Sequence, residues 1–174
     1  MSWWEVAWGW GSTAAERAAD YPCDRLLERP DHELFRAVSV AAPPSLVFRW
    51  LCQLKIAPYS YDWIDNFGRT SPRRLTPGCD QLAVGQTVMT IFRLAEFEPD
   101  VHLTLVHHGR LFGELAVTYA VTPCRLLVKL RVRYPRGPLG WLERWLLPWG
   151  DLIMMRKQLL TLKALAEGGL AFPQ

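Results

Sequence analysis

Several features that identify common classes of protein are missing from this chain of 174 residues. Its four cysteines (Cys23, Cys52, Cys79 and Cys124) are far apart and form no C-x-x-C pair, which argues against a zinc knuckle or a dithiol redox motif. No G-x-S-x-G motif, phosphate-binding loop or dinucleotide fingerprint occurs. The sequence therefore indicates no cofactor.

Long apolar runs are also missing. None approaches the roughly 20 residues that a membrane-spanning helix needs. The tryptophan-rich start lacks the basic region and the long apolar region of a secretory signal. We therefore expect a cytoplasmic protein with reduced thiols.

A large excess of one sign of charge is also missing, because the net charge is only +3. The one basic cluster alternates with apolar residues, which is more typical of a solvated strand face than of a nucleic-acid stripe. We expect no nucleic-acid partner. The cluster consists of Arg125, Lys129, Arg131, Arg133 and Arg136.

Tryptophan, in contrast, is abundant. Four of the nine (Trp3, Trp4, Trp8 and Trp10) lie in the first ten residues, and three (Trp141, Trp145 and Trp149) precede the last helical pattern. Amphipathic aromatic residues suit a packed terminus, a ligand pocket or a membrane interface. The length fits one domain over residues 1–174, in which residues 1–33 form an N-terminal extension packed on the body.

The longest helical pattern covers residues 150–168. Apolar residues recur there at spacings of three and four, which places them on one helical face: Leu152, Met155, Leu159, Leu162 and Ala166. Asp151 suits the positive end of the helix dipole, and Gly168 with Gly169 supplies a stop.

The rest of the chain reads mainly as short strands. A capping box, Thr13 to Glu16, predicts a short helix over 14–20, and residues 24–33 read as a loop. A strand is expected over 34–40, an amphipathic helix over 45–55 and a second short helix or turn over 59–68. Antiparallel strands are then expected over 86–93, 93–98, 101–107, 114–121 and 125–134, followed by a separate apolar segment over 139–147. This order predicts an α+β fold, a curved antiparallel sheet wrapped around one terminal helix.

The sequence also resembles a known family. Four segments are similar to segments of bacterial SRPBCC proteins: Trp10-Gly11-Ser12-Thr13 with Glu16, the run from Arg36 to Pro44, Arg74-Leu75-Thr76-Pro77, and Leu82-Ala83-Val84-Gly85. Tyr59-Ser60-Tyr61-Asp62-Trp63 is the most distinctive match, and Gln86 departs from the usual Asp. These proteins belong to the START-like, helix-grip superfamily, which includes the birch pollen allergen, polyketide cyclases and lipid-transfer domains. The resemblance covers roughly residues 10–167.

The resemblance implies a helix-grip fold with two short helices after the first strand. It also implies a cavity between sheet and terminal helix that binds an apolar or aromatic molecule of lipid, polyketide or quinone type. It does not imply an activity, because fold and function separate readily in such superfamilies.

The aromatic run supplies the candidate site. Its three aromatic residues are expected either to line the cavity mouth or to pack between the short helices and the sheet: Tyr59, Tyr61 and Trp63. Asp62 is the candidate catalytic residue, as a general acid/base or an anchor for a ligand hydroxyl. Its alternatives are a helix cap or an ion pair with Arg69, Arg73 or Arg74. The expected ligand contacts are Tyr59, Tyr61, Trp63, Trp50, His102, Tyr119, Met155 and Leu159.

No metal site is expected. His107 and His108 are adjacent in a strand and point to opposite faces, whereas His102 and His108 share a face without a matching acidic or cysteine cluster. Three tryptophans near the last helix are expected to contact a membrane surface weakly, to pack against the sheet edge or to gate the cavity: Trp141, Trp145 and Trp149.

Three functions remain open from the sequence. The first is non-catalytic binding of a hydrophobic small molecule in the cavity. The second is a cyclase- or dehydratase-like enzyme that uses Asp62 and the nearby tyrosines. The third is carriage of a lipid or quinone at a membrane surface.

Overall fold

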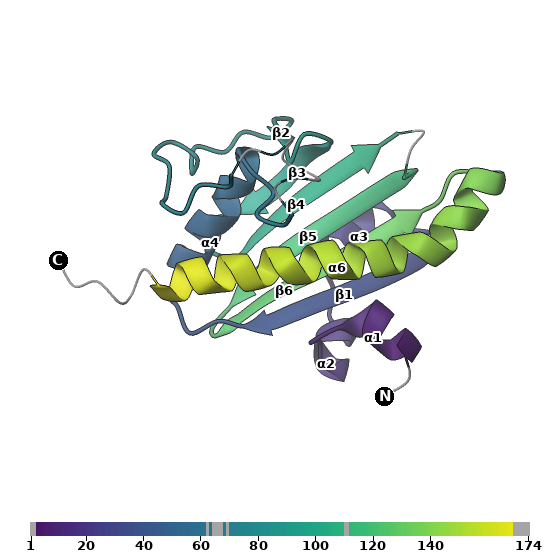
Figure 1. The fold of residues 1–174 in the computed structure, drawn as a ribbon, viewed down its shortest axis with the longest axis horizontal. Helices are drawn as coiled ribbons and strands as arrows, with labels where there is room; N and C mark the ends of the chain where they lie inside the picture. Colours follow the sequence, from purple (N-terminus) through teal and green to yellow (C-terminus); the bar gives the residue numbers. More distant parts are fainter. Residues whose placement is uncertain (1–2, 62, 64–67, 69, 110–111, 169–174) are drawn as a thin grey trace.

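Six antiparallel strands and one long helix dominate the molecule (Figure 1). The computed structural model describes residues 3–61, 63, 68, 70–109 and 112–168. The helices are α1 (Trp3–Gly9), α2 (Ala14–Ala18), α3 (Pro22–Leu26), α4 (Pro44–Cys52), the 3₁₀-helix η1 (Gln53–Lys55) and α6 (Pro138–Gly168). The strands are β1 (His32–Ser39), β2 (Thr87–Val88), β3 (Phe92–Glu98), β4 (His102–His108), β5 (Glu114–Thr122) and β6 (Arg125–Arg133).

The sheet order is β1-β6-β5-β4-β3-β2, so the first strand pairs with the last. After β1, the chain crosses to the opposite edge through α4 and then returns strand by strand to β1. Figure 1 shows α6 lying across the inner face of the curved sheet, and α3 behind the sheet. The sequence-based expectation of an α+β, helix-grip architecture is confirmed.

Strand β1 shows how residue alternation builds the two faces. Leu34 and Val38 join the main core between sheet and helices, whereas Phe35 packs with Tyr21 and Cys23 in a second cluster on the outer face. Side chains two residues apart in a strand share a face. Because β1 has apolar side chains on both of its faces, other elements must pack against each face of the sheet. Helix α6 covers the inner face, and α3 covers the outer one.

Two basic side chains of β6, Lys129 and Arg131, are largely withdrawn from solvent, and for these two the expectation of a solvated strand face was wrong. Lys129 is 5% exposed and its Nζ lies 2.6 Å from Asp24 Oδ1. Arg131 also pairs with Asp24, at 2.9 Å, and with Glu33. The N-terminal extension supplies Asp24 from α3, a helix that the sequence analysis interpreted as the start of a loop. The charges therefore join the extension to the sheet.

Helix α6 begins at Pro138, whereas the apolar periodicity predicted a start at residue 150. Pro148 lies inside the helix, where it removes one backbone hydrogen bond but does not end the helix. Figure 1 shows the helix bending toward its N-terminal end. The expected separate segment 139–147 is thus the first arm of α6. Gly140 permits the start of this arm to lie close to the loop that precedes it, because a Cβ there would collide with the carbonyl oxygen of Pro135.

The expected strand over 86–93 is interrupted. Met89 and Thr90 have positive φ angles of 47° and 69°, so the chain turns there between β2 and β3. The second short helix expected over 59–68 falls largely outside the described residues.

The cysteines provide a test of this packing. Cys124 is exposed, whereas Cys23, Cys52 and Cys79 are buried. Burial raises the pKa of Cys23 to about 11 and that of Cys52 to about 12, and it also raises the pKa of Cys79.

At about pH 8 we expect a disulfide-exchange reagent to modify one thiol in the native protein and all four after unfolding. Cys124→Ser should leave no reactive native thiol; rapid labelling of a second one would contradict the packing.

Candidate functional site

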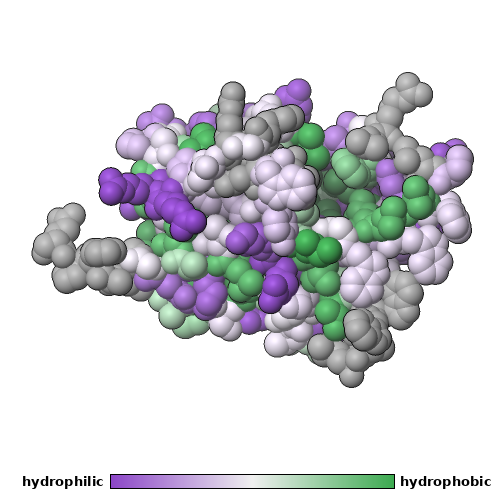
Figure 2. Space-filling view, in the orientation of Figure 1, coloured by the Kyte–Doolittle hydropathy of each residue, from purple (hydrophilic) through white to green (hydrophobic). Residues whose placement is uncertain are grey.

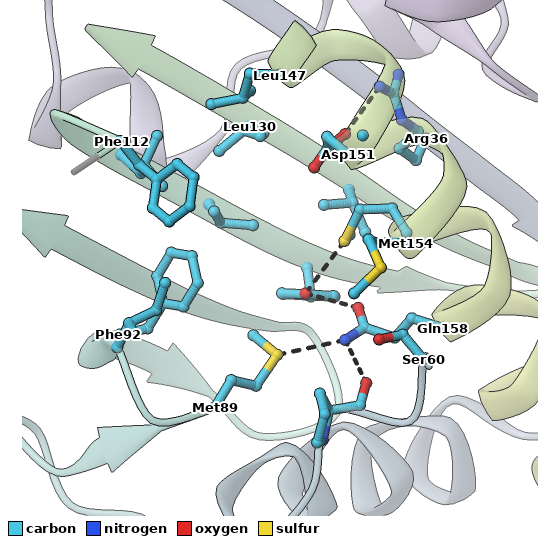
Figure 3. A pocket seen from close by; sticks show the side chains of 18 of the residues that line it. Arg36, Ser60, Met89, Phe92, Phe112, Leu130, Leu147, Asp151, Met154 and Gln158 are labelled. Atoms are coloured by element: carbon cyan, nitrogen blue, oxygen red, sulfur yellow. Dashed lines mark hydrogen bonds and ion pairs between the residues drawn. The ribbon is translucent and has the colours of Figure 1, made fainter. Parts of the chain in front are cut away.

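A cavity of about 530 Å³ lies between α6 and the inner face of the sheet (Figure 3). This volume is within the usual range for small-molecule sites, about 300–1,000 Å³. Its floor comes from inward-facing residues of the strands, and its roof comes from one face of α6. Apolar side chains form most of the wall, among them Leu115, Val117, Val128, Leu130, Leu147, Met154, Met155, Phe92 and Phe112.

Arg36 and Asp151 form a buried ion pair at one side of the cavity. Arg36 points inward from β1 and is 1% exposed; its Nη2 lies 2.8 Å from Asp151 Oδ2. The same guanidinium donates to the carbonyl oxygens of Phe35, at 2.8 Å, and Pro148, at 3.3 Å. One side chain therefore connects the edge strand to the helix at its bend.

Burial acts on both partners of this pair. Desolvation raises the pKa of Asp151 above its ordinary value, although the neighbouring guanidinium opposes the change. Desolvation also lowers the pKa of Arg36, against the influence of Asp151. The attraction between the two charges offsets the free-energy cost of removing each of them from water.

Tyr119 and Gln158 form a second polar group in the cavity. The Tyr119 hydroxyl donates to Gln158 Oε1 at 2.8 Å, and Gln158 Nε2 donates to the carbonyl oxygen of Pro58 at 2.6 Å. Met89 Sδ lies 3.3 Å from the same amide nitrogen. Burial raises the pKa of Tyr119, so this phenol keeps its proton at neutral pH. Figure 3 shows these contacts as a chain from the sheet through α6 to the loop before β2.

Glu143 is a third polar group, on the first arm of α6. Its side chain is buried and lines the cavity. The backbone N–H of Phe112 donates to Glu143 Oε1 at 3.3 Å. The three groups lie on the helix face that looks toward the sheet, because Glu143, Asp151 and Gln158 are separated by about two helical turns each.

The expected site residues are scattered. Tyr119 and Met155 line the cavity. Trp50, Tyr59 and Leu159 are buried in the main core, where the rings of Trp50 and Tyr59 meet edge to face at 6.1 Å. Tyr61 is half-buried, and Trp63 is 75% exposed. His102 lies within 4 Å of Glu96 and Glu98. Asp62 is outside the described residues, and all of these ligand contacts stay predictions.

Four cavity residues with charged or amide side chains were not among the expected ligand contacts: Arg36, Glu143, Asp151 and Gln158. A signal existed for Arg36, because a charged residue shared the inward face of its strand with Leu34 and Val38. Asp151 and Gln158 had a weaker signal, since they lie at helical spacing from Met155. Glu143 had none, because the helix around it was not expected.

No group of three or more His, Cys, Asp or Glu residues in the described part of the chain is placed to hold a metal ion. No described helix is both long enough and apolar enough to cross a membrane.

The ion pair predicts a specific dependence of stability on pH. Arg36→Met leaves Asp151 buried without its cation, which should lower the free energy of unfolding by about 3 kcal/mol at neutral pH. The pKa of Asp151 is then raised further in the folded state, so folding takes up a proton as the pH falls. The variant should therefore regain stability between about pH 7 and pH 5, as urea unfolding will measure. Adding Asp151→Asn should abolish that recovery; an unchanged pH profile would contradict the assignment.

Solved structures of other proteins include one with a similar fold. No family model and no curated protein sequence matches the chain. Among solved structures it is similar to the di-domain ARO/CYC StfQ from the steffimycin biosynthetic pathway, with a TM-score of 0.52 and 12% identity. The match covers 80% of this chain and 52% of that one, so the chain spans about half the length of StfQ.

Two other matches are weaker. Protein CV1439 from Chromobacterium violaceum has a TM-score of 0.49 and 15% identity, over 78% of this chain and 98% of that one. Aha1 from Colwellia psychrerythraea has a TM-score of 0.43 and 13% identity, over 79% of this chain and 97% of that one. The likeness to StfQ, together with the strand order and the long helix gripped by the sheet, leads to one conclusion: this chain has a helix-grip fold.

Proposed function

We propose that the protein binds a hydrophobic small molecule in the cavity between α6 and the sheet. The observation that carries this proposal is the cavity itself, about 530 Å³ with mostly apolar walls and polar groups at only a few points. Apolar surface that is left unfilled inside a protein loses contacts, and a matching apolar guest restores them. The hydrophobic wall supplies affinity, and the polar groups fix orientation.

The polar groups favour holding a ligand over transforming it. Asp151 is held by Arg36, and the proton of Tyr119 is directed to Gln158. Both are engaged in contacts within the protein. A cyclase-type reaction in the same cavity is the alternative, supported by the ARO/CYC described in the name of StfQ. That alternative requires a group that exchanges protons with the substrate, and Asp62 remains its candidate.

A cavity-filling substitution tests the binding site. Val117 lies in the floor of the cavity, so Val117→Phe should occupy part of its volume and weaken the binding of a neutral apolar dye by about tenfold. Its melting temperature should change little, because the ring enters empty space. Ile153→Phe is the matched control, since Ile153 is exposed on α6.

The measurement is a dye titration, with native mass spectrometry of the purified protein to detect a retained molecule. Equal dye affinity in both variants and the wild type would contradict binding in this cavity.

A second candidate function is carriage of a lipid or quinone at a membrane surface. The specific observation is the outer side of the first arm of α6, where Trp141, Leu142, Trp145 and Leu146 are between 47% and 67% exposed. Figure 2 shows apolar side chains gathered at this end of the molecule. Leu146 also lines the cavity. Basic residues lie beside the patch, in a hollow lined by Arg29, Arg133, Arg136 and Arg144 with one acidic residue, Asp31.

This arrangement predicts binding to anionic vesicles. Tryptophan and leucine insert at the interface, and arginines are attracted to anionic headgroups. Trp141→Ser combined with Leu142→Ser should reduce flotation with phosphatidylserine vesicles several-fold, whereas Val84→Ser, at an exposed apolar residue in the loop before β2, should not. Flotation that is equal for all three proteins would rule out membrane contact through this arm.

A further inference from the structure

Glu143 is buried in an unusual setting for a carboxylate. It is 8% exposed, it lies on the first arm of α6, and it lines a cavity whose walls are mostly apolar. Glutamate is almost never buried to this degree without a partner. Its burial therefore requires a physical explanation.

Only one of its two carboxyl oxygens has a partner among the described residues. Oε1 accepts the N–H of Phe112 at 3.3 Å, whereas Oε2 is buried and accepts no hydrogen bond there. An ionised carboxylate offers about four acceptor positions and no donor. Leaving a buried acceptor of this kind unsatisfied costs free energy, more so when the group is charged.

Two described arginines in this region are engaged elsewhere. Arg36 pairs with Asp151 at 2.8 Å, so these two charges cancel. Arg144, the next residue along the helix, pairs with Asp31 at 2.8 Å and lies over the Tyr134 ring. No described residue forms an ion pair with Glu143. The cavity thus contains one acidic group that the described part of the protein does not neutralise.

We infer that Glu143 recognises a positively charged hydrogen-bond donor on the ligand, so that the preferred guest is a hydrophobic amine. This inference rests on the proposed binding function and names the chemical class of ligand. In an apolar, partly enclosed site an ammonium group interacts with a carboxylate much more strongly than in water, and it donates a hydrogen bond to the carboxylate. A fatty acid would instead place a second negative charge beside Glu143.

The geometry also sets the orientation. Glu143 and Asp151 are eight residues apart, which corresponds to about 12 Å along a helix. Leu147 lies between them, and Met154 and Val117 continue the apolar wall. The ammonium group is held under the first arm of α6, and the apolar tail extends along the wall toward Tyr119 and Gln158.

Three probes with one tail test the inference: dodecylamine, dodecanol and dodecanoate, each displacing a neutral apolar dye at neutral pH below its micelle concentration. Dodecylamine should bind about tenfold more tightly than dodecanoate, with dodecanol between them. Glu143→Gln keeps a carbonyl oxygen for the Phe112 N–H and removes the charge. It should reduce the preference for the amine to about threefold or less and leave dodecanol binding nearly unchanged.

Glu114→Gln is the matched control, because Glu114 is a half-exposed carboxylate that pairs with Arg133 and is not among the residues lining the cavity. It should keep the full preference for the amine. Dodecanoate binding as tightly as dodecylamine to the wild type would overturn the inference, even if Glu143→Gln failed to fold. So would equal effects of the two substitutions. If the dye and all three probes fail to bind to the wild type, the proposed function itself fails.

Discussion

The ion pair between Arg36 and Asp151 is the constraint on which the interior depends. A charged side chain on the inward face of an edge strand has no apolar partner, so the helix that covers that face must supply the opposite charge. Asp151 does so three residues after Pro148, whose carbonyl oxygen accepts from the same guanidinium. The position of α6 over the sheet is thereby fixed by polar contacts at the bend. The space beside them remains unfilled, and it is the cavity.

The outer face of the sheet obeys the same rule with other residues. Lys129 is buried there, and Arg131 nearly so, only because α3 brings Asp24 to them, and because the rings of Tyr21 and Phe35 lie 5.4 Å and 5.3 Å from the Lys129 ammonium group. The N-terminal extension therefore completes the fold by neutralising charges. Both faces of this sheet contain buried cations, and on each face a helix supplies the carboxylate.

The sequence predicted the architecture well and the polar interior poorly, for physical reasons. Alternation along β5 and β6 and the apolar stripe of α6 depend on local periodicity, which a sequence displays directly. Pro148 misled the helix prediction, because the cost of one lost hydrogen bond is offset by tertiary contacts of the first arm, in which Glu143 binds the Phe112 N–H and Arg144 pairs with Asp31. Arg36, Glu143 and Asp151 lie far apart in sequence or in an element that was not expected, so their proximity to the cavity emerges only from tertiary structure. Tyr119 and Met155 were expected at the cavity and do line it, whereas Trp50 and Leu159 lie in the core around it.

Pro148 also has a mechanical consequence. It gives α6 one fewer backbone hydrogen bond at the point where its two arms meet, so the helix is softest there. The shorter arm has Glu143 on its inner side and the exposed Trp141 and Leu142 on its outer side. Any tilt of this arm about Pro148 would widen or narrow the cavity and displace the outer apolar surface in the same movement. Access to the cavity and the exposure of the outer apolar surface are thus coupled through the same movement of the first arm.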